Sequence, residues 1–366
     1  MKIAIIDADL LGRKNHSFPN LVCMKLSGYY KELGHQIELK INYEELDNFD
    51  KVYISKVFTD TIIEDHILEL PNVEYGGTGF YYDKATPLKY EIEHHMPDYN
   101  LYDKWVQEMI DGGAKRNKLE YYLDYSIGYT TRGCVRQCDF CVNRNSKKVE
   151  LHSPINEFLD KDKKYICLLD DNILAFPRYD EIFKGLQSTN KYFQYKQGMD
   201  IRFMNDKKVE ILTSSKYRGD YIFAFDNIED KSIIERKLKL WKDSCKKTTK
   251  LYVFCGFDRD DSWDKEFWKQ DIVDVFTRVK SLMQYGTLPY IMRFDKYDES
   301  PYRGTYINLA RWCNQPNFFK KKSYREFCEA NGENSATVRY MKEFEKDCPD
   351  IAKMYYDMKY EDLNKY

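Results

Sequence analysis

Short apolar runs alternate with amphipathic stretches over the first 77 residues of the chain. Apolar side chains recur at helical spacing in 20–33, and Gly34 is typical of the residue that ends a helix. The strand-like segments are 2–6, 37–40, 51–58 and 73–77, and a second helix is predicted over 61–69. Strands and helices that alternate with short loops predict a parallel sheet, here a small Rossmann-like unit.

A second alternating series begins at residue 125. Segments able to form helices, such as 229–242 and 266–284, separate its strands. The candidate strands are 125–131, 165–169, 192–196, 221–225, 251–255 and 289–294. Six strand–helix units in tandem predict an open or partial (β/α)6 barrel of the TIM type.

The remaining segments complete an α/β organisation in four parts. Residues 80–124 are polar, aromatic and poorly periodic, which favours a connecting segment that packs on its neighbours, and 301–366 are mainly helical. We therefore expect a Rossmann-like domain in 1–100, a linker in 101–124, the barrel in 125–300 and a helical extension in 301–366.

Composition and charge limit the class of protein and its expected cellular location. Apolar residues make up 43% of the 366, enough for a real core, and the net charge of −2 provides no strong global attraction to nucleic acid or anionic membrane. No uncharged apolar stretch approaches about 18 residues, so no membrane span is expected. With no sign of export, the cytoplasm is the expected location. In that reducing compartment the ten cysteines favour metal ligands or core thiols over disulfides.

Three of the cysteines are crowded into one loop that follows a predicted strand. Cys134, Cys138 and Cys141 have the spacing C-x3-C-x2-C, and Gly133 allows a sharp turn into the loop. Three thiolates from one loop can hold three irons of a [4Fe-4S] cluster and leave the fourth iron open for another ligand. A structural zinc site is the alternative, but zinc usually takes four protein ligands, and only His152 lies nearby in the sequence.

The loop and four other motifs resemble a known superfamily. Cys134, Cys138 and Cys141, with Phe140 before the last of them, resemble the signature of the radical S-adenosylmethionine (radical SAM) enzymes. The flanking TTRGC resembles the subgroup whose N-terminal domain is cobalamin-binding-like. Further motifs of one branch of that subgroup are GGTGF (76–80), EIEHHMPDYNLY (91–102), QGMDIR (197–202) and RWCNQP (311–316).

The resemblance implies an enzyme with defined cofactors. S-adenosylmethionine (SAM) would chelate the open iron, and one electron from a low-potential donor such as flavodoxin or ferredoxin would cleave it. The resulting 5′-deoxyadenosyl radical would abstract a hydrogen atom from the substrate. The resemblance does not define that substrate, which could be RNA, a peptide or a small molecule.

Polar residues follow the predicted barrel strands, at the ends where such barrels build active sites. The resemblance places Asp170, Asp171 and Asn172 where a motif contacts the substrate amino group. It places Gln197, Asp200 and Arg202 where contacts to ribose and carboxylate groups are expected. The predicted cofactor-binding residues of the barrel are Phe140, Asp170, Asp171, Asn172, Gln197, Asp200 and Arg202, and the predicted catalytic residues are Asp226 and Cys255. Helix caps and turns are the alternative roles for the acidic residues and amides.

The N-terminal domain leaves cobalamin binding open. Cobalamin domains often carry Asp-x-His-x-x-Gly after the first strand, and here Asp9 stands in place of the histidine that ligates cobalt. The resemblance still allows cobalamin, since radical enzymes of the subgroup commonly lack that histidine. Gly76, Gly77 and Gly79 could approach a cofactor through bare backbone, or could form a tight turn.

Three functions compete on these observations. The leading one is a radical SAM enzyme that modifies an unactivated carbon, with methyl transfer through cobalamin (a transferase reaction) as one form. The second is cobalamin-independent radical modification of RNA or a peptide. The third is a non-catalytic iron–sulfur or zinc protein that binds nucleic acid, which the aromatic and basic segment 318–325 (FFKKKSYR) would suit. Methylthiotransferases resemble this cysteine loop, but they carry three further cysteines in their N-terminal domain. Here that domain has only Cys23, so this activity is disfavoured.

Overall fold

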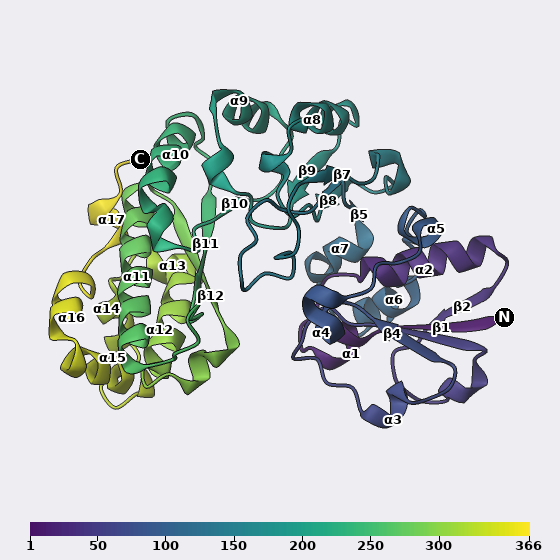
Figure 1. Ribbon diagram of the computed structural model, residues 1–366, viewed down its shortest axis with the longest axis horizontal. Coiled ribbons are helices and arrows are strands. Elements are labelled where there is room, and N and C mark those ends of the chain that lie inside the picture. Colours follow the sequence, from purple (N-terminus) through teal and green to yellow (C-terminus); the bar gives the residue numbers. More distant parts are fainter. The chain divides into compact units, whose positions relative to one another are not determined.

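The computed structural model describes residues 1–366 as a mixed α/β protein with parallel sheets (Figure 1). It divides into two compact units. Unit one contains 1–171 and 180–196, and unit two contains 172–179 and 197–366. The finer division into 1–100, 101–124, 125–300 and 301–366 stays a prediction.

Unit one begins with the predicted parallel sheet, which is confirmed. Its strand order is β2-β1-β3-β4. Side chains of the central strand alternate between two cores, with Ile5 on the face of α2 and Ile6 on the opposite face, toward α3. In Figure 1 these helices lie on opposite sides of the sheet. The elements are β1 Lys2–Asp7, α1 Ala8–Gly12, α2 Leu21–Glu32, β2 Gln36–Leu39, β3 Lys51–Ser55, α3 Asp65–Leu68, β4 Val73–Gly76 and α4 Thr78–Tyr81.

The segment from 80 to 124 is more helical than its sequence pattern indicated. It contains α5 Tyr90–Glu93, α6 Asp103–Asp111 and α7 Glu120–Leu123. Tyr102 and Val106 belong to the same buried cluster as Met24 and Leu26 of α2. This segment therefore completes the core on one face of the N-terminal sheet.

A second parallel sheet of unit one has the order β5-β8-β9, from β5 Tyr125–Gly128, β8 Tyr165–Leu168 and β9 Tyr192–Tyr195. Helix α8 (Tyr179–Ser188) packs on it through Phe183, whose ring lies 5.9 Å from those of Phe193 and Tyr195. The short antiparallel strands β6 (Thr131–Arg132) and β7 (Glu150–Leu151) close off the cysteine loop between them.

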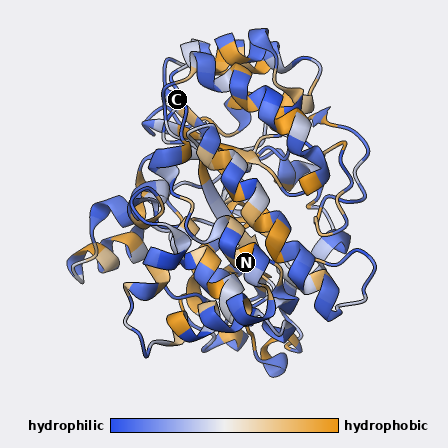
Figure 2. Cartoon of the chain, turned by 90° about the vertical axis from the view of Figure 1, so that its left-hand side faces the viewer, coloured by the Kyte–Doolittle hydropathy of each residue, from blue (hydrophilic) through white to orange (hydrophobic).

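Unit two contains the third parallel sheet, β10-β11-β12, and the C-terminal helices. Orange and blue positions alternate along the helices in Figure 2, as expected for helices with one buried face. Its strands are β10 Tyr221–Ala224, β11 Thr249–Cys255 and β12 Leu288–Arg293. Its helices are α9 Asp206–Ser214, α10 Lys231–Ser244, α11 Lys265–Gln284, α12 Arg303–Cys313, α13 Pro316–Phe319, α14 Tyr324–Glu329, α15 Ala336–Asp347, α16 Pro349–Tyr355 and α17 Tyr360–Leu363.

All six predicted strands of the second series are thus present, as two parallel three-stranded sheets. Their union into one partial (β/α)6 barrel stays a prediction. The helical character predicted for 301–366 is confirmed. The 3-10 helices are Leu46–Asn48, Tyr82–Lys84, Arg116–Leu119, Ile155–Glu157, Ile173–Ala175, Ile201–Phe203, Ile228–Asp230 and Asp295–Glu299. None of the helices has the length and apolar character that crossing a membrane requires.

The buried hydroxyl of Tyr99 fastens β5 to the helical segment before it. It accepts from the Ile127 N–H at 2.8 Å and donates to the Phe158 carbonyl at 2.6 Å. We expect Y99F to lower the free energy of unfolding by about 1–3 kcal/mol, because both buried backbone groups lose their partner. Urea denaturation measures this. Tyr90→Phe is the control, since Tyr90 is 73% exposed, and equal losses in both variants would contradict the assignment.

Candidate functional site

The cysteine loop between β6 and β7 differs from the other cysteine sites in its exposure. Cys134, Cys138 and Cys141 are partly exposed, whereas every other cysteine is buried. The Cys141 N–H donates to the Cys138 carbonyl at 2.9 Å, and the Asn143 N–H donates to the Cys141 sulfur at 3.4 Å. Accessible thiols with an N–H directed at sulfur suit an iron–sulfur cluster.

The ligand role of these cysteines nevertheless stays a prediction. No three or more His, Cys, Asp or Glu side chains of the chain are arranged so that they could hold a metal ion. What fits the cluster is the donor type and the position of three thiols in one loop, at the end of a parallel strand.

Asp170, just after β8, fastens the start of this loop. Its buried carboxylate accepts four hydrogen bonds, from the N–H and hydroxyl groups of Thr130 at 3.0 and 2.5 Å and from those of Thr131 at 2.7 and 2.8 Å. Burial raises the pKa of Asp170, and the four hydrogen bonds act in the opposite direction. Asp170 therefore holds the chain that leaves β5 against the end of β8.

Asp171 reaches further into the same loop. One of its oxygens accepts from the Gly133 N–H at 2.7 Å, and the other accepts from the Asn143 side-chain amide at 2.7 Å. Gly133 has a φ of +94°, and a Cβ there would lie 2.3 Å from the Lys148 carbonyl, so this turn requires glycine. The two predicted cofactor ligands of β8 thus position the cysteine loop, and their contact with a cofactor stays a prediction.

The segment after GGTGF also contacts the cysteine loop. The Tyr82 hydroxyl donates to the Phe140 carbonyl. Asp83 accepts from Arg144 Nε at 2.7 Å and from the Asn145 amide at 2.9 Å. Sequence reasoning missed Tyr82 and Asp83, although their place directly after a glycine-rich turn is a signal that could have found them.

Two aspartates lie at the carboxyl end of β1, Asp7 as its last residue and Asp9 in α1. Asp9 accepts from the Val57 N–H at 2.7 Å, the Phe58 N–H at 3.4 Å and the Thr61 hydroxyl at 2.5 Å. Asp7 accepts from the Tyr102 hydroxyl at 2.8 Å, and burial raises the pKa of Asp7 to about 6. Asp9 therefore holds the loop after β3 through three hydrogen bonds.

The glycines of GGTG are explained by that same loop. Gly77 has a φ of +111°, and a Cβ there would lie 2.3 Å from the Lys56 carbonyl. The Gly79 N–H donates to the Lys56 carbonyl at 3.0 Å, whereas Gly76 faces open space. The close approach at Gly77 and Gly79 is to backbone, as the tight-turn alternative expects. A cofactor contact through Gly76, Gly77 or Gly79 stays a prediction.

Several exposed apolar side chains belong to the segments around the carboxyl edge of the N-terminal sheet, and we call this set the edge patch. Ile62 is 85% exposed, and the Tyr75 and Tyr81 rings stack at 6.2 Å. The edge patch consists of Val57, Phe58, Ile62, Tyr75 and Tyr81. Parallel α/β sheets bind ligands at this edge.

In unit two, Asp226 lies at the end of β10. It accepts a hydrogen bond from the Phe254 N–H at 3.2 Å, and burial raises its pKa to about 6. The buried Arg278 guanidinium donates from Nη1 to the carbonyls of Phe225, Asp226 and Phe254 at 3.0, 2.7 and 2.9 Å. A carboxyl group that titrates near neutral pH suits proton transfer. The sequence did not reveal Arg278, which fixes the ends of β10 and β11.

The other predicted residues of unit two have mixed environments. Asp200 accepts from Arg202 Nε at 2.7 Å, so these two form an internal ion pair, while Gln197 is exposed. Asn172 is buried at the start of a 3-10 helix. Cys255 is 2% exposed and donates to the Met292 carbonyl at 3.4 Å, and burial raises the pKa of its thiol. Such a thiol is less reactive than an exposed thiolate.

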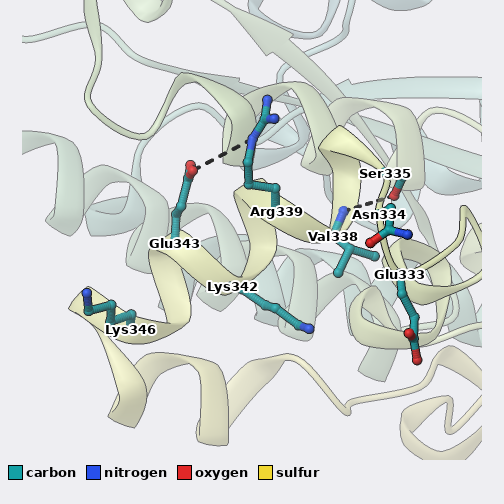
Figure 3. Close-up of a pocket in the computed structure, with 8 residues that line it drawn as sticks. All are labelled: Glu333, Asn334, Ser335, Val338, Arg339, Lys342, Glu343 and Lys346. Carbon is teal, nitrogen blue, oxygen red and sulfur yellow. Dashed lines mark hydrogen bonds and ion pairs between the residues drawn. The ribbon is translucent and has the colours of Figure 1, made fainter.

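A hollow of about 460 Å³ opens beside α15 in unit two (Figure 3). It contains none of the predicted site residues. Its lining residues are Glu333, Asn334, Ser335, Val338, Arg339, Lys342, Glu343 and Lys346.

Comparison with known proteins supports the fold. No protein-family model and no curated protein matches the sequence. The radical SAM methyltransferase TsrM from Kitasatospora setae, solved with cobalamin and a [4Fe-4S] cluster, is similar with a TM-score of 0.51 and 11% identity, over 80% of this chain and 75% of that chain. Its structure with tryptophan and the SAM analogue aza-SAM gives 0.49 and 9%, over 79% and 72%. The cobalamin-dependent SAM radical enzyme OxsB gives 0.35 and 12%, over 100% and 58%. The chain therefore shares the fold of a radical SAM methyltransferase.

Because Asp171 braces the cysteine loop, we expect D171A to lose iron to a chelator about tenfold faster than the wild type. Each lost hydrogen bond to a charged acceptor is worth about 1.5–3 kcal/mol. Absorbance of anaerobically loaded protein follows the loss. Asp139→Asn, an exposed carboxyl group of the same loop, is the control. Equal rates in D171A and the wild type would show that the loop does not depend on Asp171.

Proposed function

We propose that this chain is a radical SAM enzyme that holds a [4Fe-4S] cluster on Cys134, Cys138 and Cys141. The observation that carries the proposal is the partly exposed three-cysteine loop fastened to the ends of two parallel strands, in a chain that shares the TsrM fold. When bound, the cluster and SAM supply one-electron cleavage of SAM and hydrogen abstraction from an unactivated carbon. A cytoplasmic location belongs to this proposal.

The residues of the chain have distinct tasks in it. Asp170 and Asp171 position the loop, as their hydrogen bonds to Thr131 and Gly133 support. Exposed Arg136 offsets the negative charge of thiolates and sulfides. In unit two, the proposed cofactor contacts are Asn172, Gln197, Asp200 and Arg202, while Asp226 holds or accepts a proton from the substrate.

An electron donor is the partner that this reaction requires. The cysteine loop carries exposed cations at Arg136 and Lys147, and at Arg144 and Lys148, which pair with Asp83 and Glu150. Such a surface would attract an acidic protein, and electrostatic steering speeds association. We therefore propose a flavodoxin- or ferredoxin-type donor that docks on the loop.

Cobalamin-dependent methyl transfer is the form of the reaction that we favour. Two observations support it: the shared fold with TsrM, and the edge patch at the carboxyl edge of the N-terminal sheet. Asp9 would not ligate cobalt, because Val57, Phe58 and Thr61 already occupy its carboxylate. Cobalamin would instead lie against the apolar side chains of the patch.

The cluster is tested by reconstitution. We expect anaerobically loaded protein to hold about four irons and four sulfides, and to release 5′-deoxyadenosine with dithionite and SAM. Replacement of Cys134, Cys138 or Cys141 by Ala should abolish both, whereas Cys348→Ala, at a buried cysteine elsewhere, should retain them. Stoichiometric zinc without sulfide in anaerobically purified protein would refute the proposal.

Cobalamin binding is tested by titration of hydroxocobalamin into the loaded protein. We expect micromolar binding that I62D weakens about tenfold or more, because burial of an isoleucine side chain is worth about 1.5–3 kcal/mol. Leu33→Asp is the matched control, since Leu33 is 55% exposed, directly follows α2 and is not part of the edge patch. If no binding occurs, the N-terminal domain is a scaffold and the reaction is cobalamin-independent.

A further inference from the structure

Lys196, directly after β9, is a half-buried cation without a carboxylate partner. Its ammonium group donates to the Tyr121 hydroxyl at 3.0 Å and lies 4.3 and 5.3 Å from the ring centroids of Tyr121 and Phe18. It takes part in no ion pair of the chain. A half-buried positive charge is stabilised by an anionic partner, and two of the three N–H groups of this ammonium remain available.

The Tyr121 hydroxyl beside Lys196 also has a hydrogen left to donate. Besides the Lys196 ammonium, the Gln194 side-chain amide donates to the same oxygen at 2.7 Å. A hydroxyl has two lone pairs and one hydrogen, so both lone pairs are occupied and the hydrogen needs an acceptor from outside this group. The hydroxyl and the ammonium therefore form a set of donors without an acceptor. An anionic oxygen is the partner that such a set binds most strongly.

Two aromatic rings lie beside these donors. The Phe18 and Tyr121 rings are 4.8 Å apart at their centroids, and both side chains are half-buried. Phe18 comes from the loop between α1 and α2, whereas Tyr121 belongs to α7. Sites for small molecules combine apolar and aromatic side chains with a few convergent polar groups. The rings therefore suit an anion that is attached to an apolar group, whereas a bare ion would use the donors alone.

The donors lie at the sheet edge where α/β proteins bind ligands. The Lys196 N–H donates to the Leu168 carbonyl at 2.8 Å, at the end of the neighbouring strand β8. Asp170, two residues beyond Leu168, holds the start of the cysteine loop. Phe193 and Tyr195 pack on α8, so Lys196 belongs to the opposite face of the sheet. A ligand on Lys196 would thus lie one strand away from the attachment of the cysteine loop.

We propose that Lys196 and Tyr121 bind the anionic oxygen group of a small organic molecule, whose apolar part contacts Phe18. The group is a carboxylate or a phosphate monoester, since both accept several hydrogen bonds from an ammonium and a hydroxyl. That this molecule is the substrate of the enzyme rests on the proposed function; that it binds does not.

The test is titration of benzoate, phenyl phosphate and the neutral benzamide into the full chain, followed by saturation-transfer NMR of each small molecule. We expect at least one of the two anions to bind about tenfold more tightly than benzamide, because the donors gain most from a charged acceptor. Lys196→Met and Tyr121→Phe should each weaken binding of that anion about tenfold and leave benzamide unchanged. The ratio of benzoate to phenyl phosphate affinity identifies which anionic group the donors prefer.

Lys161→Met is the charge-matched control, because Lys161 is exposed and lies before β8, at the amino end of the same sheet. It should bind the anions as the wild type does, and circular dichroism checks that each variant is folded. If Lys196→Met does not fold, Tyr121→Phe decides. Equal affinity for benzamide and both anions, or equal losses in Lys161→Met and Lys196→Met, would overturn the proposal. The measurement needs neither SAM nor a reductant, so a failure of the proposed reaction leaves its result interpretable.

Discussion

The hydrogen bonds from the chain after β5 to the carboxylates at the end of β8 are the constraint on which the candidate site depends. Asp170 accepts four of them from Thr130 and Thr131, and Asp171 extends the attachment to Gly133. Hydrogen bonds to a charged acceptor are worth about 1.5–3 kcal/mol, and a buried carboxylate without them would be costly. The start of the cysteine loop is therefore held by hydrogen bonds whose loss would leave buried carboxylate groups without partners.

Charged side chains form hydrogen bonds with backbone groups at other strand ends as well. Asp9 after β1 collects donors from the loop after β3, and Arg278 supplies donors to the ends of β10 and β11. Parallel strands leave backbone groups unpaired where they end, and a buried charged side chain satisfies several of them at once. Each of these residues shapes a carboxyl edge, which is the part of an α/β protein that binds ligands.

The sequence predicted the strands well, because buried parallel strands are continuous apolar runs with turn residues at both ends. It missed α6, although Val106, Met109 and Ile110 follow a helical spacing, because aromatic and charged residues around them obscure the pattern. It singled out Asp170 and Asp171, but could not decide between contact with a cofactor and hydrogen bonds within the protein. That choice depends on Thr130 and Thr131, about forty residues away in the chain, and such a pairing exists only in three dimensions.

The number of donors around a carboxylate separates the two roles. Asp170 receives four hydrogen bonds and has little acceptor capacity left for a ligand. Asp226 accepts one, from the Phe254 N–H, and burial raises its pKa to about 6. Cys255 is buried, and its S–H is directed at a carbonyl. Asp226, one of the predicted catalytic residues, therefore keeps more acceptor capacity than Asp170, and its role in proton transfer stays a prediction.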